Sequence, residues 1–157
     1  MISNKVIFLD VDGVLCIDRK LSNTCIKNLK YIIENTEAKI VLSSNWRLYE
    51  KYYEKLVRVF KHYDLTIQSQ TIDLEDYRCL EIWLWCKKNK PDMCVILDDR
   101  SLDSESFGSC VKNCFVKTDP KVGLLKEQVS GIINMLNRNT LIETELNLVQ
   151  KRKNCLE

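Results

Sequence analysis

Short apolar runs that end in acids or serines constrain the fold of this chain more than any other feature. The run Val6–Leu9 is rich in β-branched and aromatic side chains and leads directly into Asp10 and Asp12. Such a run is typical of a strand that is buried on both faces. Residues i and i+2 of a strand point to the same side, so the two carboxylates would repel each other in one small volume. We therefore expect a cation or a phosphate-like group beside them.

The rest of the chain alternates between predicted strands and predicted helices. Five runs have the pattern of strands: Val6–Leu9, Lys39–Leu42, Leu65–Gln68, Cys94–Leu97 and Val111–Val116. Ser22 or Asn23 can cap a first helix, and further helical patterns extend from about Trp46 to Phe60, from Arg78 to Lys88 and from Leu124 onward. Right-handed crossovers between such units favour a parallel sheet with helices on both faces. The sequence thus predicts an α/β fold, a three-layer, Rossmann-like, doubly wound and mostly parallel sheet of about five strands.

Polar residues that follow three of these strands should meet at one edge of the sheet. In open parallel sheets, ligands bind at the carboxyl ends of the strands. An acid or a serine after a strand is usually a turn residue or a helix cap, but three such endings are harder to explain in that way. The residues placed at this edge are Asp10, Asp12, Ser43, Ser44, Asp98 and Asp99.

Composition indicates one soluble domain and excludes few partners. A chain of 157 residues, 45% of them hydrophobic and 29% charged, can bury one core. The net charge of +2 does not by itself predict a nucleic-acid or membrane partner. No apolar run is long enough to span a bilayer, and the chain enters its first strand without room for a signal peptide, so we expect a cytoplasmic protein. With four glycines and no glycine-rich phosphate loop, a nucleotide-binding P-loop is excluded.

The eight cysteines are expected to be reduced thiols. Most lie in or beside predicted strands and helices, where a thiol behaves as a small apolar side chain. Cys110 and Cys114 are the closest pair, but the chain has one histidine, His62, and no CxxC motif. A zinc site is therefore disfavoured, and His62 is expected on the surface of a helix.

Three of the strand endings together resemble the haloacid dehalogenase (HAD) superfamily. DVDGV, at residues 10–14, is similar to the first motif of that superfamily, which is DxDG followed by Thr or Val. VLSS, at residues 41–44, is similar to the second motif, a strand that ends in Ser or Thr. VILDD, at residues 95–99, is similar to the fourth motif, a strand that ends in paired acids.

The third motif is a single Lys or Arg, and Arg78 matches its usual place at the start of the helix before the fourth-motif strand. Lys87, Lys88 and Lys90 are alternatives. The resemblance spans Lys5 to about Val129. We therefore expect a capless HAD-like phosphatase domain over residues 1–138 and a C-terminal helical extension of it over residues 139–157.

The resemblance implies a Mg²⁺-dependent phosphatase that forms an aspartyl-phosphate. Asp10 would attack phosphorus, while Asp12 would first protonate the leaving oxygen and later activate water. Ser43, or Ser44 if the strand ends one residue later, would donate a hydrogen bond to a phosphoryl oxygen, and Arg78 would neutralise charge on the phosphoryl group. Mg²⁺ prefers oxygen ligands, and the implied ligands are Asp10, the backbone carbonyl of Asp12, Asp98, and Asp99 directly or through water.

Neither gap between the motifs can hold a cap domain, because residues 13–40 are used by a short turn and one helix, and residues 45–77 by one helix, a strand and their loops. An open site suits, in this superfamily, a phosphate on a large molecule such as a nucleic-acid end or a phosphoprotein.

The segment SSNWR, at residues 43–47, resembles small capless members found in RNA-repair proteins. Trp46 would stack on a base and Arg47 would hold a second phosphate at the rim, with Ser44 and Asn45 as further substrate contacts. The alternative is that Trp46 packs against the sheet and Arg47 is solvated.

Other function classes remain open at the level of sequence. A small-molecule phosphatase would use the same residues. A receiver domain is also doubly wound, but its acid pair follows the first strand, a lone Asp ends the third and a Lys ends the fifth, which is not the order here. A degenerate HAD member would bind a phosphorylated partner without turnover, yet all the acids that the chemistry needs are present.

Overall fold

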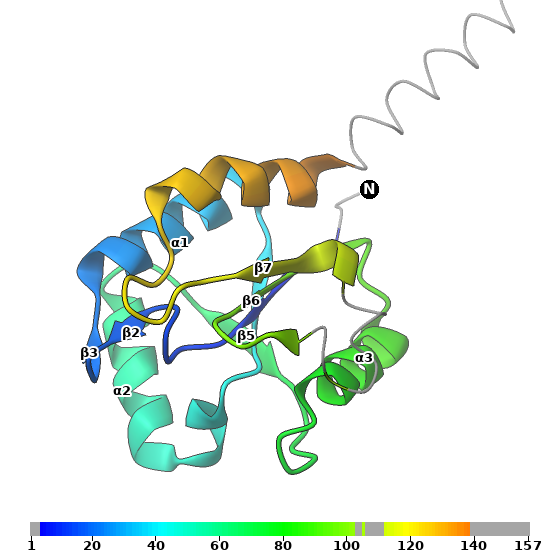
Figure 1. Cartoon of the computed structure of the whole chain (residues 1–157), viewed down its shortest axis with the longest axis horizontal. Coiled ribbons are helices and arrows are strands. Elements are labelled where there is room, and N and C mark those ends of the chain that lie inside the picture. The colour runs from blue at the N-terminus through cyan, green and yellow to red at the C-terminus, as the bar shows by residue number, and fades with distance from the viewer. Residues whose placement is uncertain (1–3, 103–104, 106–111, 139–157) are drawn as a thin grey trace, which may run out of the picture.

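The computed structural model describes residues 4–102, 105 and 112–138. Its main sheet has five parallel strands in the order β5-β4-β1-β6-β7. These strands are β1 (Lys5–Leu9), β4 (Lys39–Leu42), β5 (Ile67–Gln70), β6 (Met93–Asp98) and β7 (Phe115–Lys117). The helices are α1 (Asn23–Thr36), α2 (Glu50–Lys61), α3 (Arg78–Asn89) and a helical segment over residues 126–138. The predicted doubly wound α/β fold is confirmed (Figure 1).

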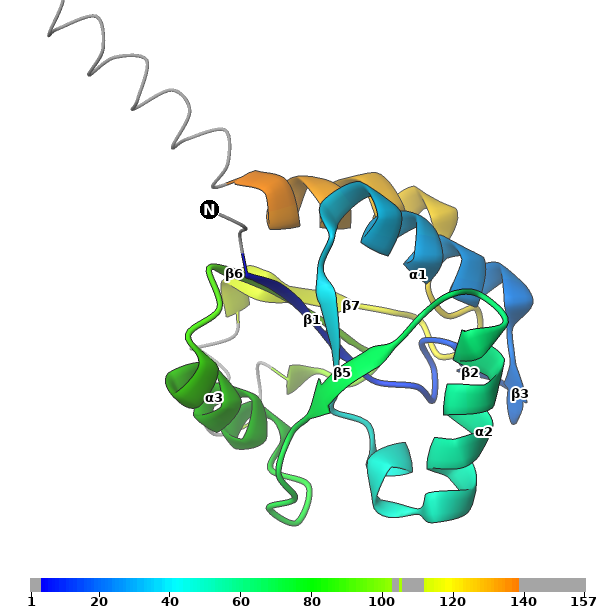
Figure 2. The ribbon, with the colours of Figure 1, turned by 180° about the vertical axis from the view of Figure 1, so that it is seen from behind.

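Helices cover both faces of the sheet because successive strand residues alternate between two apolar clusters. Ile7 and Leu9 of β1 face the larger cluster, to which α1, α2 and residues 126–138 contribute. Val6 and Phe8 face the smaller cluster, which α3 covers. Figures 1 and 2 show α1 beside the segment 126–138 on one face and α3 on the other. The central strand is thus buried on both faces, as its continuous apolar run predicts.

The register of the sheet aligns the carboxyl ends of its central strands. Leu9 is opposite Leu42 in β4 and opposite Leu97 in β6. Hydrogen bonds of the ladder continue one residue further, from Asp10 N to Leu97 O at 2.9 Å and from Ser43 N to Leu9 O at 3.0 Å. Residues that immediately follow these three leucines therefore lie side by side at one edge.

Helix α1 begins at Asn23, and the preceding Ser22 is its N-cap. Ser22 Oγ accepts a hydrogen bond from Cys25 N at 3.3 Å, which satisfies a donor in the first turn of the helix. Of the two capping residues that the sequence offered, the structure uses Ser22.

A two-stranded hairpin, β2 (Cys16–Ile17) with β3 (Lys20–Leu21), lies between β1 and α1, where the sequence predicted only a short turn. Its turn residues Asp18 and Arg19 both have positive φ, 48° and 65°. Two-residue hairpin turns need such angles, which neither residue type strongly signals. Strands of two residues are also too short to show an alternating pattern.

Three predicted elements have different bounds in the structure. The predicted helix 46–60 is divided into a 3₁₀ turn η1 (Asn45–Leu48) and helix α2, because Tyr49 between them is extended. The third strand begins at Ile67 instead of Leu65. The fifth predicted strand, 111–116, is replaced by a 3₁₀ turn η3 (Lys112–Cys114) and strand β7, with Val111 outside the described residues.

Six of the cysteines lie in the described residues, and none of these six forms a disulfide: Cys16, Cys25, Cys79, Cys86, Cys94 and Cys114. Cys110 and the predicted C-terminal extension, residues 139–157, lie outside the described residues. His62 follows the last residue of α2 and is exposed. Within the described ranges, no helix has both the length and the apolar character that crossing a membrane requires.

Candidate functional site

A cluster of three acids occupies the carboxyl edge of the sheet. Asp10 follows β1, Asp98 ends β6 and Asp99 comes directly after it. One carboxylate oxygen from each lies within 4.8 Å of the others. Asp10 and Asp98 are buried and Asp99 is half-buried, so water screens their mutual repulsion poorly. The sequence placed these three acids together, and the structure brings them together.

The electrostatics of this cluster favour a bound cation. Burial and the charge of Asp98 raise the pKa of Asp10 to about 7, although the Arg78 guanidinium opposes this shift. Burial and Asp98 also raise the pKa of Asp99. A carboxylate whose pKa is raised in this way lacks sufficient positive charge around it. Hard divalent cations bind such groups of carboxylate oxygens, so the donor set fits Mg²⁺.

Arg78 lies between the acids of the cluster. It is the first residue of α3, and its Nη1 is 2.5 Å from Asp98 Oδ2 and 3.5 Å from Asp10 Oδ1. The three alternative cations, Lys87, Lys88 and Lys90, are exposed at the opposite end of the helix. Of the four candidates for the third motif, the geometry brings only Arg78 to the acids.

Gly13 permits the close approach of the first-motif loop to Asp99. Its φ is 76°, in the left-handed region that favours glycine, and a Cβ on Gly13 would overlap the Asp99 carboxylate. The carbonyl oxygen of Gly13 also accepts a hydrogen bond of 2.7 Å from Thr118 Oγ1, a contact that the sequence did not predict. The positive φ and the lack of space for a Cβ explain why glycine follows the second acid of DVDG.

The two adjacent serines after β4 have different hydrogen-bond partners. Ser44 Oγ accepts a hydrogen bond from Trp46 N at 3.2 Å and caps η1. Ser43 is fully buried, and its Oγ has no hydrogen-bond partner among the described residues. A buried hydroxyl without a partner is unfavourable unless a ligand supplies one. Of the two serines, Ser43 is therefore the one whose hydroxyl remains available to a ligand.

Asp12 lies on the solvent side of the cluster. Its carboxylate is exposed and is not one of the three that converge within 4.8 Å. Asp12 Oδ2 accepts a hydrogen bond of 3.1 Å from the indole Nε1 of Trp46. The two acids of DVDG thus have separate environments, because β1 ends at Leu9 and the loop does not keep the alternation of a strand.

Trp46 and Arg47 do not take the positions that the sequence predicted for them. Trp46 is 6% exposed, so its ring faces cannot both be open to a base. Arg47 is 8% exposed and is not at the rim. Its guanidinium pairs with Glu81 at 3.1 Å and donates to four backbone carbonyls, those of Ser43, Ser44, Thr71 and Ile72.

The burial of Arg47 has a clear physical cause. Glu81 is 1% exposed and requires a cation, and the carbonyls after β4 and β5 require donors. One guanidinium satisfies both needs because it carries five N–H donors. Arg47 therefore clamps the second-motif loop, whereas its neighbour Asn45 is exposed beside Asp12.

Arg100 is a site residue that the sequence analysis did not single out. Its backbone N donates to Asp98 Oδ1 at 3.0 Å, and its guanidinium pairs with Asp76 at 2.9 Å. Arg100 directly follows the acid pair, and this adjacency is the signal that sequence reasoning could have used. Through Arg100, the loop that precedes α3 is tied to the end of β6.

Comparison with known proteins identifies the family. No curated protein and no solved structure matches the chain. A family model described as the HAD domain in Swiss Army Knife RNA repair proteins matches residues 6–129, which include all four motif positions and most of the described structure. The match agrees with the parallel sheet, the acid cluster and the absence of a cap in the described segments between the motifs. The chain belongs to this family of HAD domains.

Proposed function

We propose that this protein is a Mg²⁺-dependent phosphatase that removes a terminal phosphate from a nucleic acid through an aspartyl-phosphate on Asp10. The observation that carries the proposal is the meeting of five groups at the carboxyl edge of the sheet. Asp10 lies beside Arg78 and two further acids, and next to this cluster the buried Ser43 hydroxyl lacks a partner among the described residues.

The reaction proceeds in two steps. In the first, a carboxylate oxygen of Asp10 forms a bond to phosphorus, the bond from phosphorus to the alcohol oxygen breaks, and Asp12 gives its proton to that oxygen. In the second, Asp12 takes a proton from a water molecule whose oxygen attacks phosphorus. The bond between Asp10 and phosphorus breaks, and inorganic phosphate and the original carboxylate are released.

The environments of the two acids suit these roles. Asp10 is buried and held by its backbone N–H to Leu97 O, so its position is fixed for attack. Asp12 is exposed, so its carboxylate is accessible to water and to the leaving group. Its bond to Trp46 Nε1 orients the carboxylate.

Arg78 and Ser43 stabilise the charge on the phosphoryl group. A guanidinium at 3.5 Å from Asp10 is close enough to contact an oxygen of the phosphoryl group bound there. The Ser43 hydroxyl donates to another oxygen, which removes the cost of leaving it buried without a partner.

Mg²⁺ would be held by Asp10, Asp98 and Asp99, with the backbone carbonyl of Asp12 as a further ligand. When bound, the ion supplies charge neutralisation between the nucleophile and the phosphoryl oxygens. The raised pKa values of Asp10 and Asp99 support a cation at this position.

A nucleic-acid end is supported by the lack of a cap domain in the described segments and by the family. Between β1 and α3 the chain forms only a small hairpin, η1, two helices and two strands, and none of these segments is a separate cap domain. The matched family is named for RNA repair proteins, which supports a phosphorylated nucleic acid as the substrate.

A substrate screen tests the proposal. Purified protein with Mg²⁺ is incubated with 3′- and 5′-phosphorylated oligonucleotides, phosphopeptides and small phosphate esters, and released phosphate is measured. We expect release that depends on Mg²⁺, is highest on oligonucleotides and is lost in Asp10→Asn. Release that persists in folded Asp10→Asn would contradict the assignment of the nucleophile.

A further inference from the structure

A pocket of about 430 Å³ opens directly beside Asp12, between the β2–β3 hairpin and helix α2. Both Figure 1 and Figure 2 show this hairpin next to α2. The residues that line the pocket include Asp12, Arg19, Trp46, Tyr49, Tyr52 and Lys55. The pocket therefore begins at the group that protonates the leaving oxygen and extends away from the acid cluster.

Three aromatic rings form a continuous series along this pocket. The ring centroids of Trp46 and Tyr52 are 5.2 Å apart, and those of Tyr52 and Tyr49 are 6.1 Å apart. Trp46 is nearly buried against Asp12, whereas Tyr52 is 50% exposed and Tyr49 is 60% exposed. Exposure of two large rings at one site is unusual on a protein surface and is typical of recognition sites.

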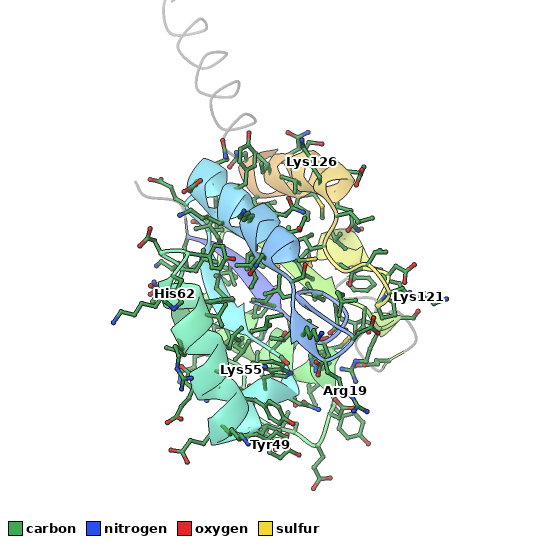
Figure 3. The ribbon with its side chains drawn as sticks, turned by 90° about the vertical axis from the view of Figure 1, so that its left-hand side faces the viewer. Arg19, Tyr49, Lys55, His62, Lys121 and Lys126 are labelled. Atoms are coloured by element: carbon green, nitrogen blue, oxygen red, sulfur yellow. The ribbon has the colours of Figure 1, made fainter. Side chains whose placement is uncertain are left out.

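Two cations flank the aromatic series. Lys55 Nζ lies 5.9 Å from the centroid of the Trp46 ring, and Arg19 is exposed at the turn of the hairpin. Figure 3 shows Arg19 and Lys55 on the same part of the surface as Tyr49, while His62 lies at the far end of α2. Rings interleaved with cations are the combination by which proteins bind single-stranded nucleic acids.

We propose that this pocket binds the terminal nucleoside of the substrate, with its base stacked on Tyr52 and Tyr49 and the adjoining phosphodiester beside Arg19 and Lys55. The inference rests on the proposed function, because it identifies the leaving group with the alcohol that Asp12 protonates. The base must leave its own stack to enter the pocket, so the preferred substrate is a single-stranded end.

The order of the groups favours a nucleotide over phosphotyrosine. In phosphotyrosine the ring is bonded directly to the phosphate oxygen, so it would need an open aromatic face next to Asp12. The ring at that position, Trp46, is 6% exposed and points its Nε1 at the carboxylate. The exposed rings, those of Tyr52 and Tyr49, lie beyond Trp46, where a base that is joined to the phosphate through a sugar would lie.

The test compares oligonucleotides that have a base at the terminal position with matched oligonucleotides that have an abasic sugar there. The 3′- and 5′-phosphorylated forms are assayed separately, each single-stranded and in a blunt duplex. For the preferred end, kcat/KM should be higher with the base by roughly five- to hundredfold, the range expected for stacking on an aromatic side chain. The single-stranded form should be preferred to the duplex.

Variants of the pocket separate stacking from other effects. Tyr52→Ala and Tyr49→Ala should reduce the ratio of base to abasic substrate towards one, and Tyr52→Phe should keep it. The matched control is Tyr31→Ala, since Tyr31 is an equally exposed tyrosine on α1, 56% exposed, outside this pocket. Lys55→Ala should weaken binding more at low salt than at high salt, and Arg58→Ala on the same helix should not.

Binding of the unreacted oligonucleotides to Asp10→Asn gives the same comparison without turnover. A base-to-abasic ratio near one in the wild-type protein, or a ratio that Tyr52→Ala leaves unchanged, would overturn the inference while the phosphatase assignment stands. A phosphotyrosine peptide turned over faster than every oligonucleotide would also overturn it. If the wild-type protein with Mg²⁺ releases phosphate from none of the substrates, that result would instead reject the proposed function.

Discussion

The indole Nε1 of Trp46 donates a hydrogen bond of 3.1 Å to Oδ2 of Asp12. This bond joins the loop after β4 to the loop after β1, and it fixes one oxygen of the group that we assign as the general acid and base. Trp46 is therefore a positioning residue that acts on catalysis through Asp12. The exposed tyrosines beside it, Tyr52 and Tyr49, would provide the surface on which a base stacks.

Trp46→Phe should slow substrates whose leaving group needs a proton. The substitution keeps an aromatic ring but removes the donor to Asp12, so the carboxylate loses its fixed orientation. We expect kcat/KM, which reports the departure of the leaving group, to fall by about tenfold on an oligonucleotide or alkyl phosphate, a part of the total effect of general acid catalysis. The kcat/KM for p-nitrophenyl phosphate should fall much less, because nitrophenolate leaves without protonation. Equal losses of kcat/KM on both substrates would contradict an orienting role in the first step.

Ser43→Ala and Ser44→Ala should separate catalysis from stability. Ser43 Oγ has no partner among the described residues, so its removal should lower kcat by about ten- to hundredfold without lowering the melting temperature. Ser44 caps η1, and its removal should destabilise the protein by about 1 kcal/mol with a small effect on kcat. Thermal melting and steady-state kinetics on both variants check this. The reverse pattern would assign the second-motif role to Ser44.

Arg47→Ala should destabilise the protein strongly. The substitution leaves Glu81 buried, with Arg78 Nε at 3.9 Å as its remaining cationic partner. It also removes the donor of the hydrogen bonds that Arg47 makes to backbone carbonyls. Removing one partner of a buried ion pair costs about 3–5 kcal/mol. Chemical denaturation should show this loss, and Arg47→Ala combined with Glu81→Gln should recover part of it. Arg58→Ala, an exposed position on α2, is the control. A loss no larger than that of Arg58→Ala would return Arg47 to the surface role that the sequence suggested.

Asp98→Asn and Asp99→Asn should have opposite effects on the melting temperature without metal. Mg²⁺ should raise the melting temperature of the wild-type protein, because a ligand that binds only the folded state stabilises it. Asp99→Asn should diminish this rise and increase the melting temperature without metal, since it removes one of three crowded carboxylates. Asp98→Asn should lower the metal-free melting temperature, because Asp98 pairs with Arg78 and holds Arg100 N. An undiminished Mg²⁺ effect in Asp99→Asn would exclude Asp99 as a ligand.

Sequence reasoning located Asp10, Asp98 and Asp99 because their positions follow from strand register, whereas it left Ser43 and Ser44 as alternatives. Once Leu9, Leu42 and Leu97 are opposite one another in a parallel sheet, the residues after them must meet at its edge. Arg47 and Trp46 could not be placed in this way. Their positions depend on Glu81 and Asp12, which come from other segments, and no local pattern encodes such contacts.

The pocket could likewise not be predicted from the sequence. It needs the hairpin that carries Arg19, which depends on two residues with positive φ, and it needs the break at Tyr49 that turns α2 away from η1. Both features arise from backbone geometry in short segments, where hydrophobic periodicity carries little information.

The most direct test of the central claim is to trap the aspartyl-phosphate. Wild-type protein with Mg²⁺ and a phosphorylated oligonucleotide is quenched during turnover and treated with borohydride, which reduces an acyl-phosphate to an alcohol and so converts aspartate to homoserine. Tryptic digestion places residues 6–19 in one peptide, and fragmentation by mass spectrometry identifies the altered position. We predict homoserine at position 10, with none in the absence of substrate. Phosphate release with an unmodified Asp10, or with homoserine at position 12, would contradict the account.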